Sequence, residues 1–218
     1  MNQRNYQREL EQIIERWKKE SRVPRLLLHS CCAPCSSYVL EYLSQYFQIT
    51  VFYYNPNISP AEEYEKRLEE QRRLVEEIPA RNPISFQAGL YEPERFFSMS
   101  QGHEEDPEGG ERCFRCYRMR LAEAARLAKK GGYDYFTTTL TISPLKNAAK
   151  LNQIGQELSE IYEVACLPSD FKKKNGYRRS VELSAQYGLY RQNYCGCVYS
   201  RRESLLREQT RRKAESGQ

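Results

Sequence analysis

Short apolar runs alternate along the chain with longer amphipathic stretches, and each kind of stretch predicts a different element. Apolar runs rich in β-branched or aromatic residues predict strands over residues 26–28, 49–54, 84–86 and 133–139. Helical spacing of apolar residues, or dense charge between turn signals, predicts helices over residues 1–20, 38–46, 61–77 and 117–129. Because helices separate the strands, the crossovers are right-handed, and we expect an α/β fold with one parallel sheet and helices on both faces.

The chain has a size that suits one domain. Its 218 residues, 39% of them hydrophobic, are enough to bury one sizeable core, and no internal repeat divides them. We therefore predict a single domain over residues 1–218, with an N-terminal helix over 1–22, a core over 25–200 and a C-terminal helix or tail over 201–218. The segment 98–110, rich in Gly, Glu and Ser, predicts a mobile loop inside the core.

The eight cysteines change this picture most. No apolar run approaches the ~20 residues that a membrane span needs, and the N-terminus is polar where a signal peptide is apolar. We therefore expect a cytoplasmic protein with no membrane partner. Because cytosolic thiols are kept reduced, clustered cysteines in such a protein indicate metal binding or redox chemistry rather than structural disulfides.

The net charge of +5 is modest, but basic residues are concentrated in the last quarter of the chain. They are Lys172, Lys173, Lys174, Arg178, Arg179, Arg191, Arg201, Arg202, Arg211, Arg212 and Lys213. A polyanionic partner fits this placement. The segment 172–179 suits an RNA-binding arm, in which cations hold phosphates and aromatic rings stack unpaired bases. The aromatic residues near it are Tyr177, Tyr187, Tyr190 and Tyr194. A solvated helix face is the alternative interpretation, and for residues 201–213 it is the better one.

Cys113 and Cys116 form a C-x-x-C pair where the 98–110 loop leads into the next helix. Such a pair presents two thiolates on one face, as iron–sulfur clusters and zinc ions require. Flanking arginines favour thiolate over thiol and suit a negatively charged cluster. These arginines are Arg112, Arg115, Arg118 and Arg120.

A second group of three cysteines, Cys31, Cys32 and Cys35, lies where the first strand should meet the next helix. Helix N-terminal amides stabilise negative charge, so we expect low pKa values for these thiols. Ligands of parallel sheets bind at the carboxyl ends of the strands. Both cysteine groups can converge at that edge.

The segment Cys195-Gly196-Cys197 has a different character. A disulfide between these two cysteines would close a very small, strained ring that is easily reduced, and Gly196 supplies the backbone freedom that it needs. Such a pair can accept or deliver two electrons. Cys166 is alone in an apolar stretch and is interpreted as an inert core residue.

Two simpler interpretations of the cysteines stay open at this point. The two groups together could bind structural zinc, which would organise an RNA-binding module without redox chemistry. The run Cys32-Ala33-Pro34-Cys35 after a strand also matches the redox motif of a thioredoxin-like thiol–disulfide oxidoreductase. Neither interpretation accounts for all seven clustered cysteines.

Several motifs in order carry a family signature. They are Leu28-His29-Ser30-Cys31-Cys32-Ala33-Pro34-Cys35, Tyr54-Asn55-Pro56-Asn57-Ile58, Glu111-Arg112-Cys113-Phe114-Arg115-Cys116-Tyr117, Thr137-Thr138-Thr139-Leu140 and Tyr190-Arg191-Gln192-Asn193-Tyr194-Cys195-Gly196-Cys197. From about residue 25 to residue 200, the chain resembles the cobalamin-independent epoxyqueuosine reductases of the QueH type. The motifs span nearly the whole chain except both termini.

The resemblance implies an oxidoreductase that performs the last step of queuosine biosynthesis in tRNA. The epoxide on the cyclopentane ring of the modified wobble nucleotide is reduced to an alkene, with water as the other product. By motif match, a [4Fe-4S] cluster is held by Cys31, Cys32, Cys113 and Cys116. Cys195 and Cys197 correspond to a redox-active disulfide pair. Cys35 is an additional candidate metal ligand, since some relatives place an aspartate there near a second, mononuclear iron. The implied partners are tRNA and an external electron donor, and DNA is not expected.

The resemblance also implies a HUP-like fold, the adenine nucleotide alpha-hydrolase-like group of parallel α/β proteins, with added helices. Relatives in that group that use ATP have a Gly-rich phosphate loop after the first strand. Here Ser30-Cys31-Cys32-Ala33 occupies that place, so an ATP-dependent ligase loses support. Candidate proton donors beside the motifs are Asp170, Tyr54 and Tyr194, although a structural hydrogen bond is the commoner role for each. His29 is expected to cap or orient the ligands.

Overall fold

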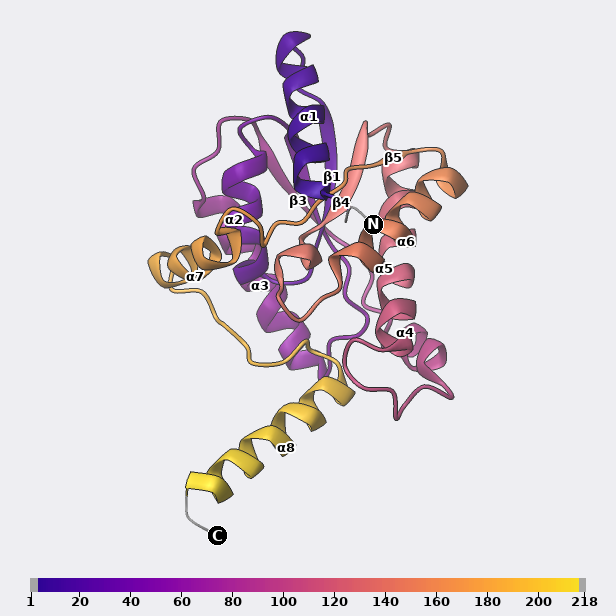
Figure 1. Ribbon diagram of the computed structural model, residues 1–218, viewed down its shortest axis with the longest axis vertical. Helices are drawn as coiled ribbons and strands as arrows, with labels where there is room; N and C mark the ends of the chain where they lie inside the picture. The colour runs from indigo at the N-terminus through magenta and orange to yellow at the C-terminus, as the bar shows by residue number, and fades with distance from the viewer. Residues whose placement is uncertain (1–3, 216–218) are drawn as a thin grey trace.

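The computed structural model describes residues 4–215, without the side chains of residues 213–215. Residues 1–3 and 216–218 lie outside the described part of the chain. The predicted N-terminal and C-terminal segments fall partly on these residues. Five parallel strands form one sheet in the order β3-β2-β1-β4-β5 (Figure 1). They are β1 (Arg25–Ser30), β2 (Gln48–Tyr53), β3 (Ile84–Ala88), β4 (Tyr135–Thr138) and β5 (Ala165–Cys166). The predicted α/β fold with a parallel sheet is confirmed. The narrower HUP-like assignment and the division into segments stay predictions.

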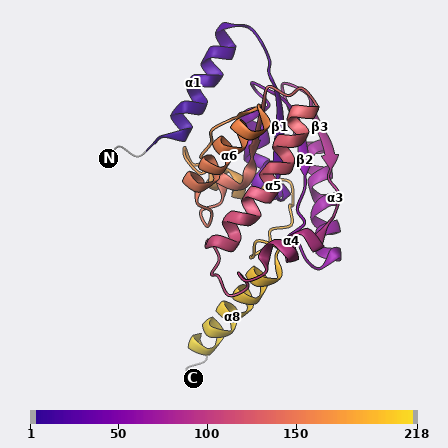
Figure 2. The same cartoon turned by 90° about the vertical axis from the view of Figure 1, so that its right-hand side faces the viewer.

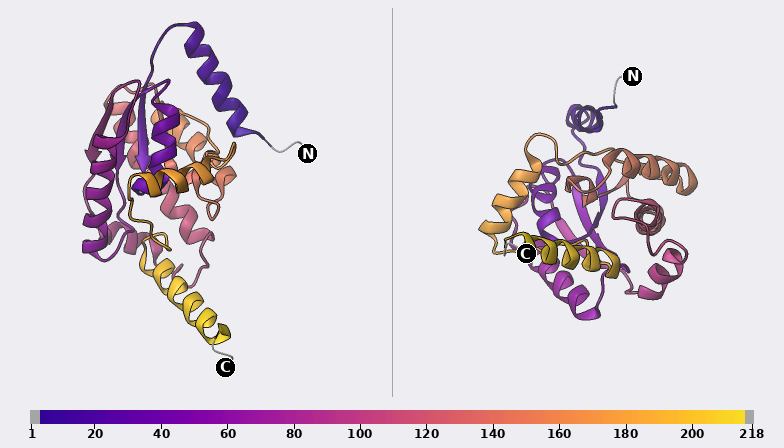
Figure 3. Two further views of the ribbon diagram at one scale, coloured as in Figure 1. Left: turned by 90° about the vertical axis from the view of Figure 1, so that its left-hand side faces the viewer. Right: turned by 60° about the horizontal axis from the view of Figure 1, so that its bottom comes forward.

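Helices surround this sheet on both faces (Figure 3). They are α1 (Tyr6–Lys19), α2 (Ala33–Leu43), α3 (Ala61–Glu77), α4 (Pro93–Ser100), α5 (Glu111–Lys130), the 3-10 helix η1 (Thr139–Ile142), α6 (Ala148–Tyr162), α7 (Gly176–Gln186) and α8 (Val198–Glu215). Side chains from α1, α2 and α3 form the core on one face, and side chains from α5 and α6 form the core on the other.

The central strand β1 supplies both cores because its side chains alternate between the two faces. Leu26 and Leu28 pack against α1 and α2, whereas Leu27 packs against α5 and α6, and all three are fully buried. This is why the strand has an unbroken apolar run rather than an apolar–polar alternation. The register aligns His29 with Phe52 of β2 and with Thr138 of β4. The carboxyl ends of β1, β2 and β4 therefore lie side by side.

Some element boundaries differ from the predicted ones. The helix predicted at 38–46 begins at Ala33, because Pro34 in its first turn suits a helix start. The helix predicted at 117–129 begins at Glu111, directly after Gly110. Cys113 and Cys116 therefore lie inside α5 and not on a loop before it.

The segment predicted as a loop over 98–110 is partly helical. Its first three residues belong to α4, which has a proline in its first turn and was not predicted. The rest is held against α5 by Arg112, whose guanidinium donates hydrogen bonds to the carbonyls of His103 (3.1 Å) and Glu104 (2.8 Å). The loop 101–110 is thereby tied to the helix that carries Cys113.

The two terminal helices lie at opposite ends of the molecule. Helix α1 lies beyond the end of the sheet where β1 begins, and α8 extends away from the opposite end (Figures 1 and 2). None of the helices between residues 4 and 215 combines the length and the apolar character that a membrane crossing requires.

Candidate metal and redox site

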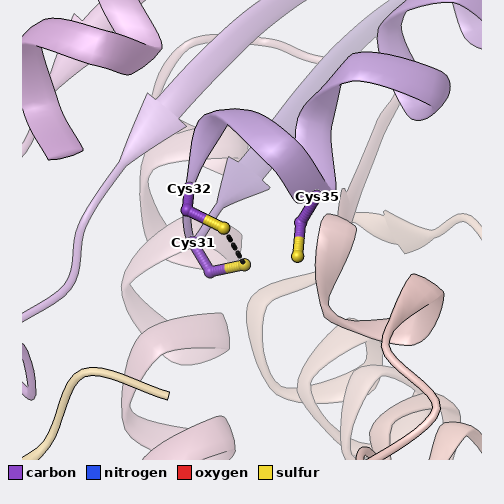
Figure 4. A group of neighbouring side chains, drawn as sticks. All are labelled: Cys31, Cys32 and Cys35. Atoms are coloured by element: carbon purple, nitrogen blue, oxygen red, sulfur yellow. Dashed lines mark hydrogen bonds between the residues drawn. The ribbon is translucent and has the colours of Figure 1, made fainter. Parts of the chain in front are cut away.

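Three cysteines gather at the carboxyl end of β1. The Sγ atoms of Cys31, Cys32 and Cys35 all lie within 4.8 Å of one another, and those of Cys31 and Cys32 are 3.8 Å apart. Figure 4 shows the first two sulfurs turned toward each other, with the third facing the same space from the first turn of α2. We call these residues the β1 triad. Adjacent cysteines share one site here because the chain turns sharply between strand and helix.

Local backbone structure positions the β1 triad. Cys32 is the N-cap residue of α2, and its carbonyl accepts the first helical hydrogen bond from the Ser36 N–H (3.1 Å). The hydroxyl of Thr139, which follows β4, forms a 3.5 Å hydrogen bond with Cys31 Sγ. The triad therefore lies at the end of β1 and contacts the end of the neighbouring strand β4.

The three thiols of the β1 triad differ in acidity. Hydrogen bonds from Cys31 and Cys35, together with the nearby Arg67 guanidinium, hold the pKa of Cys32 well below its usual range. The contact with Cys32 raises the pKa of Cys31, and the contacts with both neighbours raise that of Cys35 more strongly. The prediction of low pKa values is therefore confirmed for Cys32 and wrong for its two neighbours, because one thiolate is stabilised by the S–H groups beside it.

A second set of cysteines comes from α5 and from the segment before α8. Cys113, Cys116, Cys195 and Cys197 line one small cavity, and we call them the α5 group. The backbone N–H of Gly109 donates a 3.3 Å hydrogen bond to Cys113 Sγ. All eight cysteines of the chain are free thiols, so Cys195 and Cys197 are in the reduced form of the predicted disulfide pair.

Burial weakens the acidity of two thiols of the α5 group, Cys113 and Cys116. It raises the pKa of Cys113 and raises that of Cys116 to about 12. The prediction that four flanking arginines would favour thiolates here holds for Arg112 and Arg120, which oppose the rise in the pKa of Cys113 and Cys116, and not for the other two. Arg115 and Arg118 form exposed ion pairs with Glu111 and Glu157, and Arg112 is directed at loop carbonyls.

Arg120 links the two groups. It is 1% exposed and donates hydrogen bonds to Asn55 Oδ1 and to His29 Nε2 (3.3 Å), with Cys116 Sγ at 4.0 Å. Within residues 4–215 it forms no ion pair with a carboxylate. A buried cation without an anionic partner is costly. Thiolates or a negatively charged cluster would supply the missing anion, so the residues present fit such a group.

Cys195 joins the two cavities of the site. It lines the small cavity of the α5 group and also a larger cavity of about 280 Å³ that the β1 triad lines. The predicted ligand set of Cys31, Cys32, Cys113 and Cys116 stays a prediction. In the part of the chain that the structure describes, the β1 triad alone has three ligand atoms within 4.8 Å of one another.

Three charged residues of the site were not predicted from the sequence. Arg67 is buried, pairs with Glu63 at 2.6 Å and donates a 3.0 Å hydrogen bond to the carbonyl of Cys195. Lys146 and Glu108 form a buried ion pair at 2.9 Å, and both line the larger cavity. The sequence signal that could have indicated this ion pair is Lys146 itself, a single charged residue in the apolar segment that follows β4.

His29 is buried at the centre of the site. Its Nδ1 lies 2.8 Å from Thr138 Oγ1, and its Nε2 lies 3.1 Å from the carbonyl of Tyr54. Burial, with a further contribution from Arg120, lowers its pKa to about 3, so the ring is neutral. These contacts agree with an orienting role and leave the ring little freedom to move.

The candidate proton donors are dispersed. Asp170 pairs with Lys172 at 2.6 Å, and the Tyr54 hydroxyl accepts a 2.8 Å hydrogen bond from Arg95. Tyr194 lines the larger cavity. Only Tyr194 of the three is therefore a lining residue of that cavity.

The basic segment 172–179 is largely neutralised by carboxylates. Lys174 pairs with Glu11, Arg178 with Glu182, and Arg179 with both Glu41 and Glu182. Since Lys172 is also paired, the segment offers phosphates less charge than its sequence suggested. Tyr177 is nevertheless exposed and lines the larger cavity.

Comparison with known proteins gives a consistent result. The family model described as epoxyqueuosine reductase QueH matches residues 26–203. A relative named epoxyqueuosine reductase QueH from Streptococcus pyogenes serotype M1 is 47% identical over 198 residues, which are 90% of this chain and 78% of the relative. One of the same name from Staphylococcus epidermidis is 45% identical over 200 residues (90% and 84%), and one from Thermotoga maritima is 36% identical over 181 residues (80% and 89%).

Proposed function

The chain belongs to the epoxyqueuosine reductase QueH family, and we propose that it reduces epoxyqueuosine in tRNA to queuosine. The substrate is the wobble nucleotide of the anticodon, and the protein acts in the cytoplasm with an external electron donor. The observation that carries the proposal is the convergence of seven cysteines on two adjoining cavities at the carboxyl edge of the sheet. A binding module has no need of so many thiols around two adjoining cavities.

We assign a [4Fe-4S] cluster to Cys31, Cys32, Cys113 and Cys116, with Cys35 as a further ligand for a separate iron. The assignment is supported by the soft donor set and by the buried Arg120, which has no carboxylate partner among the described residues. When bound, such a centre supplies electrons and a Lewis acid. Arg120 then offsets part of the negative charge from its position between the β1 triad and the α5 group.

Cys195 and Cys197 act as the two-electron relay. Oxidation of the two thiols to a disulfide releases two electrons and two protons, and conversion of the epoxide to an alkene and water consumes two of each. Cys195 suits this role because it lines both cavities. The hydrogen bond from Arg67 to the Cys195 carbonyl holds this segment in place. The external donor reduces the disulfide again.

The test of the proposed function is an oxygen-free reaction of the purified protein with tRNA that contains epoxyqueuosine. Nucleoside mass analysis should show loss of one oxygen and formation of queuosine, and Cys166→Ser should react as the wild type does because Cys166 lies outside both groups. The protein should be brown, since iron–sulfur clusters absorb visible light and zinc sites do not. A colourless zinc protein that binds tRNA without reducing it would support an RNA-binding module instead.

The relay has its own test, which separates one turnover from many. Cys195→Ser should abolish repeated turnover, because a single thiol cannot form the disulfide that the external donor reduces. Its iron content should equal that of the wild type. If Cys195→Ser sustains multiple turnovers at the wild-type rate, the relay assignment is wrong while the reductase assignment stands.

A further inference from the structure

A buried ion pair lies beside the reactive thiols and is not part of the assigned ligand set. Lys146 Nζ and Glu108 Oε1 are 2.9 Å apart, and the two side chains are only 6% and 11% exposed. Such a pair is weak evidence for stabilisation, because the cost of removing two charges from water can exceed their attraction. Both residues line the larger cavity together with the β1 triad and Cys195, so their position points to a role in the chemistry.

The backbone on both sides of Lys146 is fixed. Its N–H donates a 3.2 Å hydrogen bond to the carbonyl of Ser143, in the turn that follows η1. The next residue, Asn147, is the N-cap of α6, and its side chain accepts a 3.0 Å hydrogen bond from the Lys150 N–H. The side chain of Lys146 therefore reaches Glu108 from an ordered turn at the cavity wall.

The side chain of Lys146 carries protons that a ligand can receive. Burial by itself would lower its pKa, but interactions with Cys195, Tyr117 and Glu108 raise the pKa of Lys146 well above its usual range. The group is therefore an ammonium ion at neutral pH, and it has three N–H donors. Among residues 4–215, Glu108 accepts the one hydrogen bond that Lys146 Nζ donates, so two donors remain for a ligand in the cavity.

Other lining residues are less suited to protonate an oxygen anion. Arg191 has a guanidinium, which keeps its protons in proteins. Tyr194 is uncharged, and burial raises its pKa. Lys146 combines a transferable proton with a positive charge, and both favour the oxygen anion that forms when an epoxide C–O bond breaks.

We propose that Lys146 donates the protons that convert the epoxide oxygen into water and that Glu108 holds its ammonium group in place for this step. The inference rests on the proposed function and adds a catalytic residue to it. In the reaction two C–O bonds break, a carbon–carbon π bond forms, and the oxygen leaves with two protons as water. The two electrons come from the thiols of Cys195 and Cys197, which release two protons as their disulfide forms.

Glu108 also connects Lys146 with the thiols that release these protons. It lines the small cavity of the α5 group as well as the larger cavity, as Cys195 does. Its Oε2 lies 3.7 Å from Arg207, which is a weaker contact than that with Lys146. Protons that leave Cys195 and Cys197 return to Lys146 through the Glu108 carboxylate, so the ammonium is restored after each transfer.

The first test replaces Lys146 with a cation that keeps its protons. Lys146→Arg retains the charge that pairs with Glu108, so its iron content after reconstitution and its affinity for tRNA should equal those of the wild type. The rate of epoxide loss in a single turnover should fall by about 100-fold, because the guanidinium is a very weak acid. Lys129→Arg makes the same change in an exposed pair of equal length with Glu163 and should react as the wild type does.

A second variant separates proton donation from charge and from folding. Lys146→Ala leaves space for a small cation beside Glu108, and added ethylammonium should raise its single-turnover rate by about tenfold. Tetramethylammonium has the same charge but no N–H group, so it should leave the rate unchanged. Restoration by both cations, or by neither, would contradict proton donation by Lys146.

The results also separate this inference from the proposed function. A Lys146→Arg protein that reacts at the wild-type rate, or that loses activity together with its iron or its affinity for tRNA, would overturn the inference while epoxide reduction by the wild type stands. Wild-type protein that leaves the epoxide intact would overturn both.

Discussion

The β1 triad and the α5 group adjoin through Cys195, but they are assembled in different ways. Cys31, Cys32 and Cys35 come from a single strand-to-helix junction, and the turn of the chain alone brings their sulfurs together. The α5 group joins one helix to a segment about 80 residues later, so it depends on tertiary packing. In a metal centre that uses both groups, the ligands from the β1 triad are brought together by local backbone structure. The ligands from the α5 group come together only in the folded protein.

The two groups also differ in electrostatics. In the β1 triad, neighbouring sulfurs and Arg67 lower the pKa of Cys32. In the α5 group, burial raises the pKa of Cys116 to about 12, with Arg120 opposing the shift. Cys32 is therefore ready to bind a cation, whereas Cys31 and Cys35, like Cys113 and Cys116, lose their protons only when a metal replaces them. Metal binding by Cys113 and Cys116 should release more protons than metal binding by Cys31 and Cys32.

The largest effect is expected at Lys146 and Glu108, whose ion pair lies next to both groups. Lys146→Met removes the 2.9 Å partner of buried Glu108, which keeps only the longer 3.7 Å pair with Arg207, so the free energy of unfolding should fall by about 2 kcal/mol. Urea unfolding without oxygen measures it. Lys129→Met, which breaks the exposed pair with Glu163, should cost less than about 0.5 kcal/mol. Equal losses in the two variants would show that the buried pair has no special role in the site.

The next effect tests the link between the groups. Arg120→Met keeps a side chain of similar length and removes the buried cation, so the bound iron after reconstitution should fall by about tenfold. Arg115→Met, on the exposed face of the same helix, should bind iron as the wild type does.

Stability separates this explanation from simple misfolding. The metal-free Arg120→Met protein should lose less than about 2 kcal/mol of unfolding free energy, since the lost hydrogen bonds are offset by removal of an unpaired buried charge. A variant that retains full iron content would contradict the proposed link.

The smallest effect concerns the basic segment before α7. A triple substitution of Lys172, Lys173 and Lys174 by alanine should lower tRNA affinity by less than about threefold, because carboxylates already neutralise two of these lysines. Titrations at several salt concentrations provide the measurement, and the slope against salt should change by less than about one. A tenfold loss with a clearly smaller slope would restore this segment as the RNA-binding arm.

The sequence predicted the sheet and the β1 triad well because both depend on local patterns. Leu26 to Leu28 form an apolar run in front of the cysteines, and the strand ends where they begin. Helix α5 begins six residues before its predicted start, because the charged turn that follows the predicted loop over 98–110 is already helical.

The charged residues of the site escaped prediction because their partners are distant in the chain. Arg67 contacts the carbonyl of a residue 128 positions later, and Lys146 pairs with a glutamate 38 positions earlier. Neither contact leaves a periodic or motif-like trace in the sequence.

The central claim is that the β1 triad and the α5 group hold one metal centre between them. Iron and acid-labile sulfide should be measured after oxygen-free reconstitution in the wild type, Cys32→Ser, Cys116→Ser and Cys166→Ser. The wild type and Cys166→Ser should contain about four irons and about four sulfides for each chain, and each of the other two variants less than about one iron. Full iron content in either Cys32→Ser or Cys116→Ser, or none in the wild type, would contradict a shared centre.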